Sequence, residues 1–297
     1  MSKRWLTLLL LTTLGLLLTI AWPHGGQRGA ELVADKWSLP DPMADKLFED
    51  FSDMPSQGPP AQELPSLHQR KPPLKRGRSH GVIALIIDDI GYDLERERAL
   101  LAMPFPLAVS VLPEAPHAKR AADMAHAAGR VVMLHLPMEP SNPKLRAGMD
   151  DSFLRLGMSA AALRNRMVTA LSHLHSVEGV NNHMGSLLTA DRKAMRVVMA
   201  ECRKRNLFFV DSRTGARSVA ADEARVAGIR WASRQVFLDH IDDSATIAKA
   251  WRHAVLIADH RGSCVVIAHP RRRTVAFLAT LTTADRARMR PVTDLLQ

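Results

Sequence analysis

Hydrophobic and polar positions follow one repeating pattern along most of this chain. From Gly81 onward, short aliphatic or β-branched runs alternate with amphipathic stretches in which apolar residues recur every three or four positions. The runs predict strands buried on both faces, and the stretches between them predict helices that cover a sheet. The runs are IALIIDDIG, PLAVSVLPE, VVMLHLPMEP, GVNNHMGS, LFFVDSRT, RWASRQVFLDH and SCVVIAHP. This alternation predicts an α/β fold, a parallel sheet or (β/α) barrel of about seven parallel strands.

The first 80 residues lack this pattern. Residues 1–22 contain Lys3 and Arg4 followed by an uncharged, mostly apolar run, which is typical of a signal peptide or signal anchor. Residues 23–80 are rich in Pro, Gly, Ser and charge, and this composition predicts a disordered linker before a folded domain at residues 81–297. We therefore expect an exported protein that is periplasmic, or anchored in the inner membrane by its N-terminus and facing the periplasm.

The composition limits the range of partners. A formal net charge of +10 favours contact with acidic envelope polymers, anionic lipid or nucleic acid. Because only 5% of the residues are aromatic and no nucleic-acid-binding motif occurs, we expect no nucleic acid partner. The two cysteines, Cys202 and Cys264, form no CxxC motif. We interpret them as small buried hydrophobic residues, with a disulfide as the alternative in an exported chain.

Acidic and histidine side chains lie at the ends of most of the predicted strands. They are Asp88, Asp89, His135, His183, Asp211, Asp239, His240 and His269. Because the carboxyl ends of parallel strands meet at one face, we expect these side chains to converge there. Aspartate and histidine without cysteine favour a zinc-like divalent ion with open positions for water. A metal would also relieve the repulsion between Asp88 and Asp89, since one could bind the ion while the other acts as a base.

The sequence contains no motif that indicates several other common types of site. No GxGxxG, GxxxxGK[ST] or GxSxG motif occurs, so dinucleotide-binding, P-loop and serine hydrolase functions are not indicated. The tripeptide Ile-Asp-Asp recurs at Ile241–Asp243, directly before a long amphipathic stretch, where we predict that it caps a helix. Ser159 and Thr189 are also expected to be helix caps.

The segment from about Ile83 to the C-terminus resembles the divergent polysaccharide deacetylases, a branch of the metal-dependent carbohydrate deacetylases. The motifs IIDDIGY, LHLPMEP, GVNNHMGS, FFVDSRT and IAHP occur in the order found in that family. The resemblance implies a (β/α) barrel of about seven strands and a divalent metal cofactor, with Zn²⁺ as the expected ion. It also implies hydrolysis of linear amides, the N-acetyl groups of an envelope polysaccharide or peptidoglycan-like glycan.

The resemblance assigns roles to five of these residues. Asp88 matches the catalytic base of the first family motif, and Asp89 matches its metal ligand. His135 lies where the family places metal-binding histidines, and His183, which belongs to the signature of this branch, is expected to be the third ligand. His269 matches the histidine that protonates the leaving amine.

Three further residues are candidates for substrate binding or for supporting the ligands. Asp211 is expected to bind the metal or to orient a histidine, and Arg213 to bind an anionic group or to pair with Asp211. Glu139 is expected to support the site or to face solvent, with a role as a base as the further alternative. The sequence lacks the second histidine and the Arg-x-Pro-Tyr motif of the better-known deacetylases. The alternative function is therefore a non-catalytic envelope binding protein that retains the deacetylase barrel.

Overall fold

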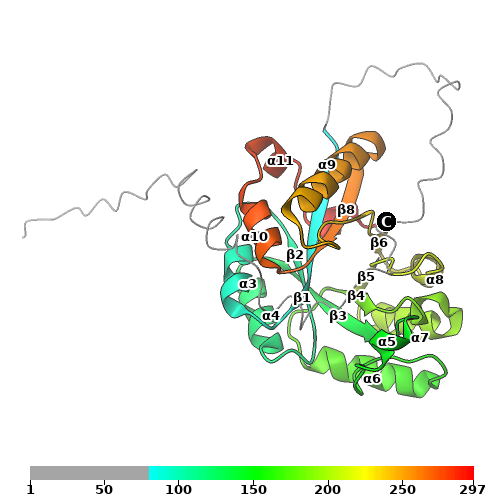
Figure 1. Ribbon diagram of the computed structural model, residues 1–297. Coiled ribbons are helices and arrows are strands. Elements are labelled where there is room, and N and C mark those ends of the chain that lie inside the picture. The colour runs from blue at the N-terminus through cyan, green and yellow to red at the C-terminus, as the bar shows by residue number, and fades with distance from the viewer. Residues whose placement is uncertain (1–79) are drawn as a thin grey trace, which may run out of the picture.

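Eight parallel strands form one curled sheet in the computed structural model, which describes residues 80–297 (Figure 1). The strands are β1 (Val82–Ile90), β2 (Ala108–Val111), β3 (Val131–Met138), β4 (Gly179–Met184), β5 (Phe208–Asp211), β6 (Trp231–Ser233), β7 (Val236–Phe237) and β8 (Ser263–Ala268). Their order across the sheet is β6-β5-β4-β3-β2-β1-β8-β7. The predicted parallel α/β barrel is confirmed. The predicted leader (1–22) and nearly all of the predicted linker (23–80) lie outside the described residues.

Helices surround the sheet and cover its outer face (Figure 1). They are α3 (Leu94–Leu101), α4 (Ala118–Ala127), α5 (Pro143–Arg146), α6 (Ala160–Ser172), α7 (Arg192–Lys204), α8 (Ala220–Ala227), α9 (Ser244–Arg261), α10 (Arg272–Ala279) and α11 (Thr283–Ala287). Two short 3-10 turns occur at Leu188–Ala190 and Val292–Leu295. Within residues 80–297, none of the helices combines the length and the apolar character that crossing a membrane requires.

The packing of β1 on both of its faces explains why its sequence is a continuous apolar run. Ile83, Leu85 and Ile87 pack in the larger hydrophobic cluster, together with residues of the surrounding helices. Ala84 and Ile86 point to the opposite face and pack in a second cluster, which side chains of the neighbouring strands fill. Successive side chains of a strand point to opposite faces, so both sets must be apolar when both faces are buried.

The sixth predicted strand differs from the expectation because it is two strands. Trp231–Ser233 pairs with β5 at one edge of the sheet, whereas Val236–Phe237 pairs with β8 at the other edge. Only Arg234 and Gln235 separate the two segments, so an extended chain can keep the two edges at most about 11 Å apart. The sheet must therefore curl into an almost closed barrel, although β6 and β7 are not paired with each other.

Side chains bridge this seam between β6 and β7. Arg234 Nε donates to the carbonyl of Ser212 at 2.6 Å, and Nη2 donates to the carbonyl of Arg213 at 2.8 Å. The guanidinium also lies 5.1 Å from the centre of the Phe237 ring. Gln235 Oε1 accepts from the amide of Val265 at 2.6 Å. Because the Arg234 side chain is buried, its pKa falls to about 10, which still leaves the group charged at neutral pH.

Two of the predicted helix caps are confirmed and one is wrong. Asp243 Oδ2 accepts from the amide of Thr246 at 2.8 Å, so the second Ile-Asp-Asp segment does cap α9. Ser159 caps α6. Thr189 instead donates its hydroxyl to the carbonyl of Gly185, and Asp191, two residues later, caps α7. The chain completes a 3-10 turn before this helix begins, which moves the cap along the sequence.

Both cysteines are buried free thiols. Burial raises the pKa of Cys202 and of Cys264 to about 12, so little thiolate exists at pH 8. We expect Ellman's reagent to react negligibly with the folded protein and to titrate both thiols after unfolding in guanidinium chloride. Rapid reaction of the folded protein would contradict this burial, and fewer than two thiols per unfolded chain would contradict the free state.

Candidate functional site

Five of the predicted side chains converge at the carboxyl ends of neighbouring strands. Asp88 and Asp89 end β1, His135 lies on β3, His183 lies on β4, and His269 directly follows β8. All except His183 are at least 96% buried, and the His183 side chain is 13% exposed. The parallel topology therefore brings two carboxylates and three imidazoles into one buried cluster, as the strand-end pattern predicts.

The backbone at the end of β1 is shaped to present Asp89. Asp89 has φ of 55°, a left-handed conformation that side-chain-bearing residues adopt at a free-energy penalty. Gly91 has φ of 123°, and a Cβ atom added there would lie 2.5 Å from Cβ of Ala115. The buried carboxylate of Glu97 accepts hydrogen bonds from the amides of residues 91–93 at 2.7–3.3 Å. This carboxylate holds the strained turn in place.

Asp89, His135 and His183 form a triangle of groups that could hold a metal ion. Asp89 Oδ1 lies 3.2 Å from His135 Nε2 and 3.2 Å from His183 Nδ1, and the two nitrogens are also 3.2 Å apart. Neither carboxylate oxygen of Asp89 accepts a hydrogen bond of acceptable geometry within the described region, although both are buried. Buried carboxylate oxygens without a donor are costly, and a cation among the three groups would satisfy them.

The two adjacent carboxyl groups differ in their affinity for a proton. Burial raises the pKa of Asp88 above its usual value, despite the opposing charges of His135 and His269. Burial acts in the same direction on Asp89, but the charge of His183 and the close approach of His135 outweigh it and hold the pKa of Asp89 well below its usual range. The environment thus favours a charged Asp89 and gives Asp88 the greater tendency to take up a proton.

Asn181 connects the base candidate to a ligand candidate. Its Nδ2 donates to Asp88 Oδ1 at 2.8 Å, and its Oδ1 lies 2.7 Å from His135 Nδ1. Ser110 Oγ also donates to Asn181 Oδ1. Because an amide oxygen only accepts, His135 carries a proton on Nδ1, so in its neutral form Nε2 offers a lone pair towards Asp89.

Asp239 orients His269 in a similar way. The buried Asp239 carboxylate accepts from the amide of His269 at 2.8 Å, from its Nδ1 at 3.0 Å and from Thr274 Oγ1 at 2.6 Å. Burial disfavours its charged form, but the charges of His269 and Arg271 outweigh this and lower the pKa of Asp239. The ring of His269 is therefore fixed with Nε2 towards the cluster, 3.7 Å from Asp89 Oδ2.

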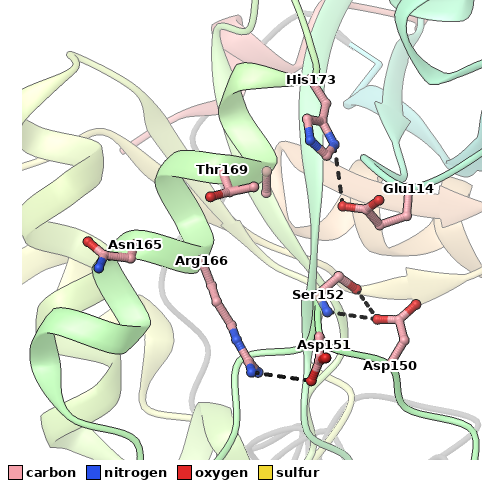
Figure 2. Close-up of a pocket in the computed structure, with 9 residues that line it drawn as sticks. Glu114, Asp150, Asp151, Ser152, Asn165, Arg166, Thr169 and His173 are labelled. Carbon is pink, nitrogen blue, oxygen red and sulfur yellow. Dashed lines mark hydrogen bonds and ion pairs between the residues drawn. The ribbon is translucent and has the colours of Figure 1, made fainter.

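A small cavity lies against the cluster, and a larger hollow lies beside it. The small cavity, of about 20 Å³, has room for a few water molecules at most. The larger hollow, of about 650 Å³, lies between α6 and the loop at residues 150–152, with Arg166 directed towards Asp151 and His173 towards Glu114 (Figure 2). Ser152 lines this hollow, and the ring of the next residue, Phe153, lies 6.1 Å from the His183 ring, so this loop runs from the hollow to the cluster.

The geometry agrees with a comparison against protein families. A model of the divergent polysaccharide deacetylases matches residues 85–296, which include every side chain of the cluster. This chain belongs to the divergent polysaccharide deacetylase family. The resemblance that the strand-end motifs predicted is thereby confirmed.

Relatives in this family cover much of the chain. An uncharacterized protein of Haemophilus influenzae is 38% identical over 196 residues, which are 66% of this chain and 69% of that protein. The uncharacterized Escherichia coli protein YibQ is 36% identical over 198 residues, 67% of this chain and 61% of that protein. The crystal structure of an uncharacterized Agrobacterium tumefaciens protein superimposes with a TM-score of 0.67 at 19% identity, covering 74% of this chain and 91% of that one. This last likeness concerns the fold.

Asp211 and Arg213 lie together at the end of β5, away from the histidines. Asp211 Oδ1 accepts from the amide of Arg213 at 2.8 Å, and Oδ2 accepts from Ser218 Oγ at 2.9 Å. Arg213 has φ of 50°, and its carbonyl accepts from Arg234. Asp211 thus shapes the loop after β5, and its side-chain hydrogen bonds within residues 80–297 are with Arg213 and Ser218 rather than with the ligand triangle.

Glu139 organises the loop after β3. Its Oε2 accepts from the amide of Leu156 at 2.7 Å, and Oε1 lies 3.7 Å from Arg146. Its backbone carbonyl accepts from the amides of Leu187 and Leu188. Glu139 therefore links two loops at the mouth of the deacetylase barrel. The hydrogen bonds and the ion pair described above join it to these loops rather than to the cluster.

Two supporting residues, Asn181 and Asp239, were not assigned roles from the sequence. Asn181 lies two positions before His183 on β4 and pairs in register with His135 on β3. Side chains two apart on a strand share a face, so this spacing was a usable signal. Asp239 was noted as a strand-end acid, but its partner His269 is 30 residues away and follows another strand, β8. Sequence spacing alone does not pair these two.

Proposed function

We propose that this chain is a metal-dependent hydrolase that removes N-acetyl groups from an envelope polysaccharide or peptidoglycan-like glycan. The observation that carries the proposal is the Asp89–His135–His183 triangle with Asp88 and His269 beside it in one buried cluster. Membership of the divergent polysaccharide deacetylase family supports a carbohydrate substrate. The combination supplies a metal site, a base candidate and an acid candidate within a single cavity.

The dimensions of the triangle support zinc as the ion. Zinc bonds to imidazole nitrogen and carboxylate oxygen of about 2.0–2.2 Å give a tetrahedron with edges of about 3.3–3.6 Å. The three separations of 3.2 Å between the ligand atoms are close to one face of that tetrahedron. Three protein ligands would leave a position for water, as in catalytic zinc sites. His183 from β4 completes the set, so a second histidine after β3 is not needed.

The surrounding side chains supply the proton transfers. A zinc ion held by Asp89, His135 and His183 would polarise the carbonyl group and lower the pKa of water to about 7. Asp88 takes a proton from the attacking water as its oxygen bonds to the acetyl carbon. His269, whose Nδ1 is held by Asp239, donates a proton to the amide nitrogen as the C–N bond breaks. Water has then been added across the amide, and the products are acetate and a free amine.

The hollow beside the cluster suits a polymer chain. Its lining of carboxylate, amide, hydroxyl and guanidinium groups, from residues such as Asp150, Asn165, Arg166 and Thr169, offers hydrogen bonds for sugar hydroxyls. The apolar run with preceding basic residues in segment 1–22 supports export, to the periplasm or to the periplasmic side of the inner membrane. A membrane tether would keep the barrel close to such a glycan.

The test is release of acetate by the purified full-length protein. N-acetylated chitooligosaccharides and peptidoglycan are incubated with zinc-loaded protein, with chelator-treated protein, and with treated protein given zinc again. We expect acetate from at least one glycan, loss of release after chelation, and recovery with zinc. A protein that retains zinc but releases no acetate from any glycan would contradict the proposal and favour the non-catalytic binding protein.

A further inference from the structure

Ser212 borders the catalytic cavity but belongs to none of the groups described above. It follows β5, is only 4% exposed, and lines the same cavity of about 20 Å³ as Asp88, His135, His183 and His269. Asn182 and Thr214 also line it, together with the apolar side chains of Met184, Phe237 and Ile267. The cavity therefore combines hydroxyl groups, an apolar wall and the reactive cluster.

The backbone of Ser212 is held on both sides. Its amide donates to Asn182 Oδ1 at 3.0 Å, and its carbonyl accepts from Arg234 Nε at 2.6 Å. Arg234 is itself buried in the seam between β6 and β7, so this position is fixed by two rigid parts of the barrel. The side chain of Ser212 consequently projects from a backbone that has little freedom to move.

The Ser212 hydroxyl has no hydrogen-bond partner within residues 80–297, although it is buried. The donor groups of Thr214 and Asn182, which also line the cavity, already have hydrogen-bond partners. Thr214 Oγ1 donates to the carbonyl of Met184 at 2.7 Å, and Asn182 Nδ2 donates to the same carbonyl at 2.7 Å. A buried hydroxyl without a partner is uncommon, because its desolvation is not compensated. In a cavity of this kind it is positioned for a group that enters from outside.

We propose that Ser212 donates a hydrogen bond to the acyl oxygen of the substrate and to acetate after cleavage. This inference rests on the proposed hydrolysis and adds a further catalytic residue to it. As water adds to the carbonyl carbon, negative charge develops on the acyl oxygen, and a pre-positioned donor stabilises this charge more than it stabilises the neutral carbonyl.

Ser233 provides a matched control in the same barrel. Its hydroxyl is likewise buried without a hydrogen-bond partner among the described residues, but it lies on β6 and does not line the cavity. Ser212→Ala and Ser233→Ala each remove one such hydroxyl. Any effect of losing a buried serine hydroxyl as such is therefore common to both variants, whereas loss of the acyl donor is specific to the first.

The experiment compares these variants as full-length, zinc-loaded proteins. We expect Ser212→Ala to lower kcat for acetate release by about 100-fold. KM for the glycan and the affinity for zinc should each change by less than about twofold, because the donor acts mainly in the transition state. Calorimetric titration with sodium acetate should show binding weakened by about tenfold, as loss of a hydrogen bond to a charged group implies. Ser233→Ala should match the wild type in all four quantities.

Three outcomes separate this inference from the proposed function. Wild-type acetate release with unchanged kcat and acetate affinity in Ser212→Ala would overturn the inference and leave the hydrolase intact. Absence of hydrolysis in the wild type, together with acetate binding that depends on Ser212, would overturn the hydrolase and support the donor. If Ser212→Ala fails to fold, Ser212→Cys replaces it, because cysteine has a similar size and retains a weak donor. Acetate binding that is measurable but weaker than in the wild type then supports the donor, whereas unchanged acetate affinity overturns it.

Discussion

Asp89→Asn is expected to weaken zinc binding by more than about 100-fold, since loss of a group that only supports a ligand already lowers metal affinity 10- to 100-fold. Asparagine has the same shape and tolerates the left-handed backbone that Asp89 adopts at φ of 55°, so the turn after β1 should persist. What the variant lacks is the negative charge that faces His135 and His183. Zinc affinity is measured by competition with a chromophoric chelator, and folding is checked by circular dichroism.

The second Ile-Asp-Asp segment supplies the control for this variant. Asp243→Asn makes the same chemical change in the same tripeptide, but Asp243 caps α9 and lies outside the triangle. Asparagine is also a good cap, so we expect zinc affinity and thermal stability close to those of the wild type. Equal zinc affinity in Asp89→Asn and the wild type would rule out Asp89 as a ligand.

Asp88→Asn is expected to reduce kcat for acetate release by about 1000-fold, within the range of 10²–10⁴ that general base catalysis contributes. The asparagine oxygen can still accept from Asn181 Nδ2, so the link to His135 is preserved while the ability to take up a proton is lost. Asp88 Oδ2 lies 3.7 Å from His135 Nε2, outside the ligand triangle, so zinc affinity should change by less than about tenfold.

Zinc content and acetate release must be measured on the same Asp88→Asn preparation. A variant that binds zinc normally and has lost activity identifies Asp88 as the base. A variant that releases acetate within tenfold of the wild-type rate at saturating zinc would show that another group takes the proton. A variant that loses zinc together with activity would instead indicate that Asp88 is a zinc ligand.

The sequence was sufficient for the fold class and for the centre of the site. Aliphatic runs that end in Asp or His predicted parallel strands with converging termini, and Asp89, His135 and His183 do lie within 4.8 Å of one another by their ligand atoms. This works because parallel strands point their carboxyl ends the same way. The identity of strand-end residues is then enough to place them together, even without knowledge of the strand order.

The parts that the sequence did not predict depend on contacts between distant segments. The run containing Arg234 and Gln235 was predicted as one strand, because nothing local reveals that its halves pair with opposite edges of the sheet. Asp211 is a strand-end acid like Asp88, yet it binds its own loop through Ser218. Local patterns give the end of a strand, whereas the direction of each side chain there depends on the neighbouring strands and loops.

The pairing of β1 with β8 has a consequence for how this protein acquires activity. The contact joins the strands that come first and last along the chain, so among the strand pairings of the sheet it closes the longest loop and is entropically the most demanding to form. It also sets Asp88 and Asp89 beside His269, which follows β8. A chain shortened before β8 would lack both the partner of β1 and the proton donor. Assembly of the proposed catalytic groups therefore depends on this strand pairing, and regain of the proposed acetate release during refolding should follow the docking of β8 on β1.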